Sequence, residues 1–377
     1  AKELFTLAFG QDPRPASDEQ VRAALIAAAK EQGVTEFSTR FLVSEWVNVI
    51  DAWQVATFDA YKGVPRRGRA NRMGAKQRER IWPVFERARQ TLDAQGIASW
   101  PTIFGRVTKY FEDRPNKPFT HAIVDEAQDL GVPELRMLAA ITQAGSNALF
   151  FACDLGQRIF QEPFSWLAMG VDVRGRSRTL KVNYRTSHQI REAADKLLPR
   201  LVRDVDGLEQ DRSGTVSVFN GPEPEVSKTS SIAAETREVA KWIERALADG
   251  VAAAEIGLFV RSNAQLGRAR AAVNMAGQKV VELSERSEEP QGRVAIGSMH
   301  LAKGLEFKAV AVMACDDDIL PLQERVETVA DESELDDVYE TERQLFYVAC
   351  TRARDRLLIS AVAPGSEFII DFEQSLA

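Results

Sequence analysis

Residues 119–129 read FTHAIVDEAQD, and this stretch decides the fold class. It opens with a short apolar run, which is typical of a strand buried in a parallel sheet, and the run leads directly into the carboxylates of Asp125 and Glu126. A predicted helix (133–145) and a second apolar run (148–153) come next. Strands that alternate with helices indicate a parallel sheet with crossover helices. The predicted class is therefore α/β.

The chain changes character on either side of this stretch. Residues 18–116 are predicted to be mostly helical, beginning behind Ser17, which is suited to cap a helix. From about residue 214 a second series of strands and helices follows. We therefore predict three parts, which are a mostly helical segment (1–117), a first α/β part (118–180) and a second α/β part (181–377).

Composition restricts the class of protein further. The 377 residues are 45% hydrophobic and 27% charged, which is ordinary for a globular chain. No apolar run approaches the roughly 20 residues that span a bilayer, and the N-terminus has no export-signal pattern. Three scattered cysteines argue against a disulfide framework or a zinc site. We expect a cytoplasmic protein without a membrane partner.

The net charge of −7 hides a strong segregation of charge. Residues 62–89 hold ten Lys or Arg and two Glu, whereas residues 316–342 hold twelve Asp or Glu and one Arg. The overall charge therefore does not exclude nucleic acid as a partner. Within the acidic segment, residues 324–341 are predicted to form a surface loop.

Asp125 and Glu126 follow a predicted strand, and ligands of parallel sheets bind where the strands end. Nucleotide hydrolysis needs one carboxylate to hold magnesium and another group to orient the attacking water. Asp125 suits the first role and Glu126 the second. A solvated acidic turn is the simpler explanation for such a pair standing alone.

Four further segments carry polar residues that suit nucleotide chemistry. The segment 153–160 (CDLGQRIF) contains Gln157, and 182–187 (VNYRTS) contains Tyr184 and Arg185. The other two are GSMHLAKGLEF at 297–307 and YVACTRARDRLLIS at 347–360. An arginine from one domain can stabilise charge on a nucleotide held by another. Taken singly, each segment is better explained as ordinary surface or core than as a site.

In order and spacing, these five segments resemble the signature motifs of the UvrD/Rep group of superfamily 1 helicases. They match motifs II to VI across roughly residues 119–360, with Cys153 in place of the usual glycine of motif III. The resemblance implies two RecA-like lobes, of which the first is N-terminally incomplete and carries the helical segment as an insertion. It also implies an ATP-dependent DNA helicase or translocase that moves 3′ to 5′ on single-stranded DNA.

The resemblance assigns a role to each matching residue. Asp125 is expected to bind Mg²⁺ with ATP and Glu126 to activate water, while Gln157 senses the γ-phosphate. Tyr184 is expected to stack on adenine, with Gly304 and Glu306 at the nucleotide. The remaining roles are γ-phosphate contact for Arg185 and Arg352, and contact with the DNA backbone for Ser298 and His300.

Single-strand binders combine a positive groove with aromatic platforms. Trp166 is the best candidate platform, and a buried core tryptophan is the equal alternative. The basic cluster supplies candidate phosphate contacts, for which a solvated helix face is the alternative; they are Arg66, Arg67, Arg69 and Arg72. The expected partner is single-stranded DNA or a junction of single-stranded and duplex DNA.

The sequence departs from the family in two places. It has no G-x-x-x-x-G-K-[ST] loop, whose amides and lysine hold the β- and γ-phosphates. Either the chain begins past that loop, or the protein is degenerate and does not hydrolyse ATP; a non-catalytic DNA-binding or scaffold module is thus the alternative function. About 110 residues separate Tyr184 from Ser298, so the large domain inserted there in many relatives is expected to be absent or reduced.

Overall fold

The structure is a computed structural model that describes residues 1–64, 73–145, 147–159, 164–203, 205–207, 209–284, 291–327 and 332–373. The chain divides into two compact units. The first comprises residues 1–154, 160–176 and 204–206, and the second comprises 155–159, 177–203 and 207–377. The predicted boundaries at residues 117 and 180 stay a prediction.

Helices dominate the first unit. They are α1 (Lys2–Phe9), α2 (Asp18–Glu31), α3 (Thr39–Glu45), α4 (Phe58–Gly63), α5 (Ala75–Ala94), α6 (Trp100–Glu112) and α7 (Val132–Ile141), with a π-helical turn at Trp46–Asp51. As expected, Ser17 caps α2 by accepting from the amide of Gln20 at 3.2 Å. Trp46, Tyr61 and Phe85 pack in the core that α2, α3, α4 and α5 share. The predicted mostly helical character of residues 18–116 is thus confirmed.

Two short parallel strands carry the acidic motif of the first unit. Strand β1 (Ala122–Val124) pairs with β2 (Leu149–Phe151), and α7 connects them. The predicted burial of β1 is wrong, because Ile123 is 81% exposed and its neighbour Phe150 is 62% exposed. Ile123 and Phe150 are paired neighbours and therefore lie on the same face of the two strands. The described residues leave this face largely open to solvent.

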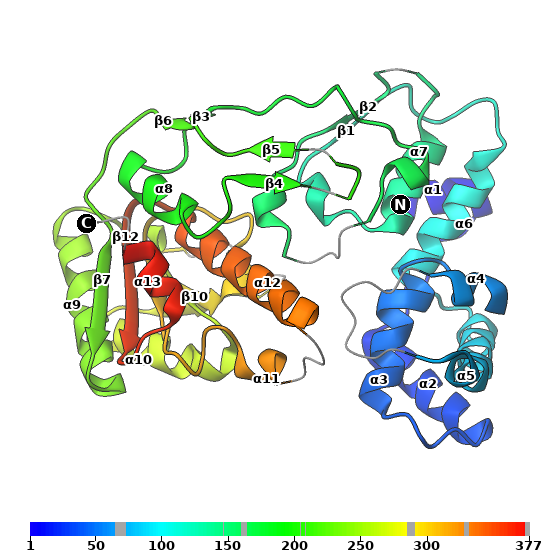
Figure 1. The fold of residues 1–377 in the computed structure, drawn as a ribbon, viewed down its shortest axis with the longest axis horizontal. Coiled ribbons are helices and arrows are strands. Elements are labelled where there is room, and N and C mark those ends of the chain that lie inside the picture. The colour runs from blue at the N-terminus through cyan, green and yellow to red at the C-terminus, as the bar shows by residue number, and fades with distance from the viewer. Residues whose placement is uncertain are drawn as a thin grey trace. The chain divides into compact units, whose positions relative to one another are not determined.

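The second unit has a larger parallel sheet flanked by helices (Figure 1). Its main strands are β7 (Glu225–Thr229), β8 (Ile256–Val260), β9 (Val280–Glu282), β10 (Val294–Ser298), β11 (Phe307–Met313) and β12 (Ala353–Val362). Its helices are α8 (His188–Asp195), α9 (Ile232–Ala248), α10 (Leu266–Met275), α11 (Gln323–Val326), α12 (Glu332–Cys350) and α13 (Glu367–Glu373). The strand order is β7-β12-β11-β8-β10-β9, and every pairing is parallel. The predicted α/β class is confirmed.

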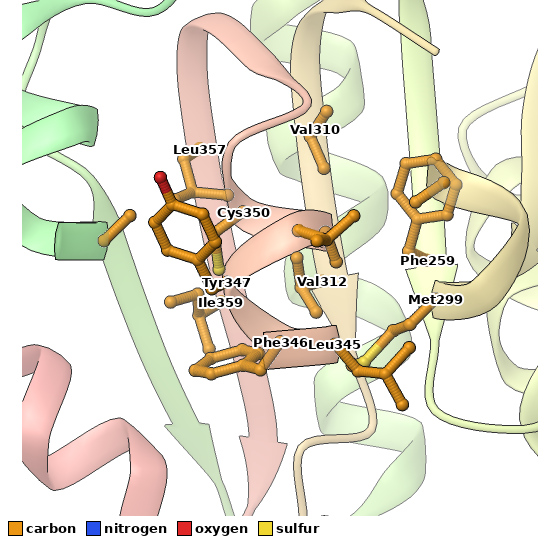
Figure 2. Packing of buried hydrophobic residues seen from close by; sticks show 14 of the residues in the cluster. Phe259, Met299, Val310, Val312, Leu345, Phe346, Tyr347, Cys350, Leu357 and Ile359 are labelled. Atoms are coloured by element: carbon orange, nitrogen blue, oxygen red, sulfur yellow. The ribbon is translucent and has the colours of Figure 1, made fainter. Parts of the chain in front are cut away.

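Alternation along β11 divides the core of this unit in two. Val310 and Val312 face α8, α12 and α13, and Figure 2 shows Val312 near Leu345 and Phe346 of α12. Ala309 and Ala311 face the opposite way, toward α9 and α10. Helices on both faces explain why the central strands are fully buried. Every described β8 residue, for example, belongs to the buried class.

Two small sheets and the described helical residues of 324–341 complete the second unit. Strand β3 (Val182–Asn183) pairs in parallel with β6 (Val216–Ser217), and β4 (Leu201–Arg203) pairs antiparallel with β5 (Glu209–Asp211). The prediction of a loop at 324–341 is wrong, because α11 and the first half of α12 occupy much of it. Asp336, Asp337 and Glu340 are exposed residues of α12 rather than of a loop.

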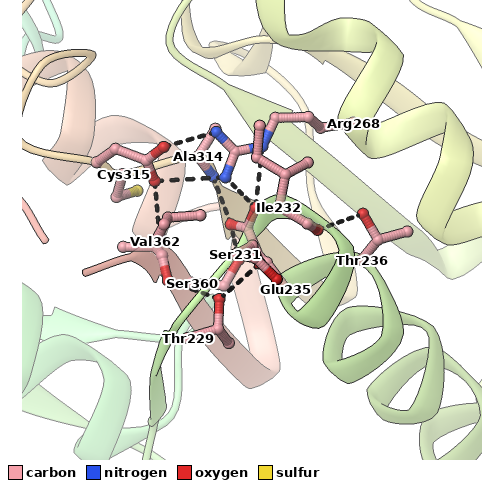
Figure 3. Close-up of polar contacts among 12 residues, drawn as sticks. Thr229, Ser231, Ile232, Glu235, Thr236, Arg268, Ala314, Cys315, Ser360 and Val362 are labelled. Carbon is pink, nitrogen blue, oxygen red and sulfur yellow. Dashed lines mark hydrogen bonds and ion pairs between the residues drawn. The ribbon is translucent and has the colours of Figure 1, made fainter. Parts of the chain in front are cut away.

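A buried ionic cluster ties α9, α10 and the sheet together (Figure 3). The guanidinium of Arg268 pairs with Glu235 and, at 2.7 Å, with Asp316. Glu235 also accepts from the hydroxyl of Ser360 at 2.8 Å and from the amide of Ala314 at 2.9 Å. Buried charges are tolerated when they are paired and hydrogen-bonded in this way.

No helix in the described part of the chain is long and apolar enough to cross a membrane.

Candidate functional site

The acidic turn that follows β1 belongs to the first unit. Asp125 and Glu126 are both exposed at the end of the strand where ligands of parallel sheets bind. Glu126 has φ 51°, a left-handed conformation that is uncommon for residues other than glycine. Its carboxylate accepts from the side-chain amide of Gln128 at 2.5 Å, and Gln128 in turn accepts from the amide of Asp154 at 3.1 Å. The turn after β1 is thereby tied to the segment after β2.

The acidic turn could supply one ligand to a metal ion whose other ligands come from a bound nucleotide and water. No cluster of three potential metal ligands occurs among the described residues. Mg²⁺ is commonly held by one or two carboxylates together with water and phosphate oxygens, so the exposed carboxylate of Asp125 fits Mg²⁺ bound with a nucleotide. The constellation alone does not make a stand-alone metal centre.

Trp166 is held in place by an aspartate that is distant in sequence. The carboxylate of Asp206 accepts from the amide of Trp166 at 2.7 Å, from that of Leu167 at 3.0 Å, and from the hydroxyl of Ser165 at 2.5 Å. The indole is half-buried and meets Phe151 edge to face, with ring centroids 4.7 Å apart. The ring of Trp166 is packed against Phe151 and partly exposed. It therefore has features of both alternatives, a buried core tryptophan and a stacking platform.

In the second unit, Arg352 and Gln157 meet where the strands of the large sheet begin. Arg352 immediately precedes β12, and its guanidinium donates to the side-chain oxygen of Gln157 at 3.1 Å. Lys303 donates from Nζ to the backbone oxygen of Gln157 at 2.8 Å. Arg352 is only 1% exposed, and its Nε donates to the oxygen of Val348 at 2.9 Å.

Arg185 and Glu306 lie at the same edge. Glu306 immediately precedes β11, and its carboxylate is 3.2 Å from Nε of Arg185. The amide of Ser187 donates to the oxygen of Arg354 at 2.9 Å, which places the segment of Arg185 beside the start of β12. We call Gln157, Arg185, Lys303, Glu306 and Arg352 the N-edge cluster.

Two other predicted nucleotide contacts border the N-edge cluster in sequence. Tyr184 precedes Arg185 and is 74% exposed, so its ring is open to stacking. Gly304 lies between Lys303 and Glu306 with φ 79°, which a residue with a side chain rarely adopts. The chain therefore turns sharply at the point where it reaches the N-edge cluster.

Ser298 and His300 lie at the opposite edge of the sheet. Ser298 is the last residue of β10 and pairs with Val260, the last residue of β8. Burial, assisted by the charge of Arg261, lowers the pKa of His300 below its ordinary value. At neutral pH His300 is therefore uncharged, and it can contact a phosphate by hydrogen bonding but not as a cation.

The predicted residues thus form separate groups. Asp125, Glu126 and Trp166 belong to the first unit, and the N-edge cluster belongs to the second. Ser298 and His300 share the second unit with the N-edge cluster but lie at the other end of its strands. The predicted phosphate contacts of the basic cluster lie outside the described residues; they are Arg66, Arg67, Arg69 and Arg72.

Sequence reasoning missed three residues that organise these groups. Lys303 lies in the segment 297–307, three residues before Glu306. Its closeness in sequence to a predicted site residue was the signal that could have found it. Asp206, which orients Trp166, lies 40 residues along the chain and gave no local signal. Glu342 accepts two hydrogen bonds from Arg261 across a separation of 81 residues, so only the fold reveals that pair.

The second unit is thus a parallel α/β lobe with arginine, lysine and glutamine side chains gathered where its strands begin. Residues 271–363 match the UvrD-like helicase C-terminal domain family. The resemblance to the UvrD/Rep group is therefore confirmed, and the family match lies in residues 271–363.

Named relatives agree over short segments. ATP-dependent DNA helicase UvrD1 of Mycobacterium leprae is 40% identical over 94 residues, which are 24% of this chain and 11% of that protein. ATP-dependent DNA helicase Rep of Buchnera aphidicola is 37% identical over 73 residues, or 19% of this chain and 10% of Rep. The alignments thus span about a tenth of each relative's length.

A solved structure of the C-terminal domain of a possible DNA helicase from Lactobacillus plantarum is 23% identical, with a TM-score of 0.36. The comparison covers 52% of this chain and 96% of that domain.

Proposed function

We propose that this chain is part of an ATP-dependent DNA helicase or translocase. The N-edge cluster is the observation that carries the proposal. Arg352, Arg185 and Lys303 place three cations, together with the amide of Gln157, at one end of a parallel sheet. Arginine and lysine side chains stabilise the charge that develops during phosphoryl transfer.

In this proposal each side chain has one task at the nucleotide. Asp125 holds Mg²⁺, which supplies charge neutralisation on the phosphates when bound, and Glu126 orients the attacking water. Arg185 and Arg352 contact the γ-phosphate, and Gln157 reports its presence. Tyr184 stacks on adenine, while Gly304 and Glu306 border the nucleotide.

The DNA partner is proposed to be single-stranded DNA or a junction with duplex. Trp166 serves as a stacking platform, because its ring is half-buried and anchored through Asp206. Ser298 and His300 contact the DNA backbone, as do Arg66, Arg67, Arg69 and Arg72. Movement from 3′ to 5′ and a cytoplasmic location belong to the same proposal and rest on the UvrD/Rep resemblance.

Without a phosphate-binding loop in its sequence, this chain alone is expected not to hydrolyse ATP at a useful rate. The alternative is a non-catalytic DNA-binding or scaffold module, and the missing loop is what favours it. Binding of a labelled oligothymidylate, followed by fluorescence anisotropy across a salt series, tests the part that both functions share. A DNA-stimulated ATPase of residues 1–377 that Glu126→Gln abolishes would show that the expected inactivity is wrong.

Binding of a fluorescent ATP analogue separates the motor from the scaffold module. A motor component should bind the analogue at the N-edge cluster, and Arg185→Gln should weaken that binding. A scaffold module should bind the oligonucleotide but leave the analogue unbound. If the chain binds neither ligand, the proposed function is rejected.

A further inference from the structure

Helix α12 connects the two edges of the large sheet. Its C-terminal end leads into Arg352 at the edge where the strands begin. Its residue Glu342 pairs with Arg261, which directly follows β8 at the edge where the strands end. A rise of 1.5 Å per residue separates Glu342 from Arg352 by about 15 Å along the helix. One helix therefore reaches both the N-edge cluster and the edge of Ser298 and His300.

The carboxylate of Glu342 is the fixed point at the second edge. It accepts from Nε and Nη2 of Arg261 at 2.5 and 2.6 Å, from Nη1 of Arg325 at 2.9 Å, and from the amide of Leu322 at 3.2 Å. Glu342 is fully buried, and Arg261 is 3% exposed. Burial opposes ionisation of Glu342, but the hydrogen bond and charge of Arg261 lower its pKa below the ordinary value. The carboxylate is therefore charged and fully engaged.

The same helix also packs on the turn that carries His300. Met299 and Ala302, which flank that residue, share the hydrophobic core with Leu345 and Phe346 of α12, and Figure 2 shows Met299 beside Leu345. Only three residues separate Glu342 from Leu345, so the ion pair and this apolar contact lie on adjoining turns of the helix. A displacement of α12 cannot leave the His300 turn unchanged.

Apolar packing alone would hold α12 against the sheet, so the buried pair needs a separate explanation. Replacing a buried ion pair by apolar side chains of similar volume is commonly neutral or stabilising. What the pair adds is one defined arrangement, because a bidentate arginine fixes both the distance and the rotation of its partner. The position of α12 is thereby set relative to β8 and β10.

We propose that Glu342, held by Arg261, is a positioning residue that makes α12 transmit a change at the His300 edge to Arg352 at the other edge. This inference rests on the proposed function, in which DNA contacts the first of these edges and nucleotide the second. Glu342 touches neither ligand and acts through the helix.

The experiment follows the two edges separately in the full chain. The Nε–H signal of Arg352 and the ring signals of His300 are recorded by NMR while oligothymidylate is added, and fluorescence anisotropy measures affinity. Because the protein has three histidines and Arg352 donates its Nε–H to a buried carbonyl, both signals can be assigned by substitution. In the wild-type protein, DNA should shift both signals.

Two variants and one control make the test decisive. Glu342→Gln leaves Arg261 buried without its counter-charge and can unfold the unit, so the principal variant is Arg261→Met with Glu342→Leu, which keeps an apolar core. It should bind the oligonucleotide and shift His300 as before, while the Arg352 response is lost. The control, Glu340→Gln, alters an exposed carboxylate of the same helix and should behave as wild type.

The contrary outcomes distinguish a failure of this inference from a failure of the proposed function. An Arg352 response that persists in the double variant, or is lost equally in the Glu340→Gln control, overturns the role of Glu342. A wild-type protein that binds DNA without any Arg352 response does the same and leaves the proposed function standing. A wild-type protein that fails to bind the oligonucleotide rejects the DNA-binding function together with the inference.

Discussion

Arg352 donates to the side chain of Gln157 although 195 residues separate them in sequence. Gln157 is attached to the second unit, while residues 1–154 immediately before its segment belong to the first. Arg352 is almost completely covered in this arrangement. A phosphate that is to bind Arg352 must therefore compete with Gln157 for the guanidinium.

Removing that acceptor should destabilise the second unit. In Gln157→Ala, Nη2 of Arg352 loses the acceptor at 3.1 Å and keeps the hydroxyl of Thr351 at 3.3 Å, so we expect a loss of about 1 kcal/mol. Urea unfolding followed by circular dichroism measures the change. Gln323→Ala removes an exposed glutamine from α11 and should change stability by less than about 0.5 kcal/mol. Equal losses in both variants would contradict the role of the Arg352 contact.

Trp166 should contribute measurably to the affinity for single-stranded DNA. Stacking of a base on an aromatic ring is worth about 1–3 kcal/mol, so Trp166→Ala should weaken oligothymidylate binding by about 5- to 150-fold. Trp100 is a matched control in the same unit, because it is 43% exposed and stacks on Phe104 at 5.9 Å. If Trp100→Ala weakens binding as much as Trp166→Ala, the assignment of the platform is wrong.

The cluster of Glu235, Arg268 and Asp316 should be essential to the second unit. Arg268→Met leaves two carboxylates without their buried counter-charge, and breaking such a pair typically costs about 3–5 kcal/mol. Arg270→Met, two residues along α10, breaks an exposed pair with Glu282 and should cost less than about 1 kcal/mol. Thermal unfolding of the two variants should differ accordingly. Equal melting temperatures would show that burial adds nothing at this site.

Asp51 should make the first unit more stable in mild acid. Burial, only partly opposed by hydrogen bonds from Ser99 and Thr102, raises the pKa of Asp51 from 3.8 to about 6. The folded carboxyl therefore holds a proton between these values where the unfolded one is ionised, so its contribution to stability rises as pH falls from about 6 to about 4 and is lost above about 6. At neutral pH the ionised group costs about 3 kcal/mol.

Asp51→Asn should remove this pH dependence and stabilise the protein at pH 7, as unfolding curves at several pH values would show. Asp113→Asn, at an exposed position, should retain the wild-type profile. An unchanged profile in Asp51→Asn would assign the pH dependence to another group.

Cys153 should be the one cysteine that reacts in the native protein. It is exposed, whereas Cys315 and Cys350 are completely buried, and burial raises the pKa of both buried thiols well above the ordinary value. Since the thiolate is the reactive form, a maleimide should add once before unfolding and three times after it. Mass spectrometry counts the additions. Native labelling of Cys350 would contradict the described core.

Local patterns were enough to predict the class and several elements. The Ser17 cap marked the start of α2, and the apolar run at 148–153 identified β2. The start of α12 was missed because acidic composition describes exposure and not backbone conformation. The burial of β1 was predicted wrongly because burial depends on what covers a strand, which no window of sequence contains.

The site could be predicted as a set of residues but not as a geometry. Motif order gave Arg185, Glu306 and Arg352, yet their common edge follows from the register of β11 with β12. Asp206 and Glu342 act through tertiary contacts with partners 40 and 81 residues away. Such contacts leave no periodic signal, so they emerge only from the folded chain.

The open face of β1 and β2 has a practical consequence for handling the protein. Ile123 and Phe150 are exposed, and β1 and β2 pair with no further strand among the described residues, so their outer sides can template a foreign strand. Aggregation of the protein should therefore depend on its concentration as well as on temperature. Light scattering of stored samples should increase with protein concentration, and a lysine placed at position 123 should keep the solution clear for longer.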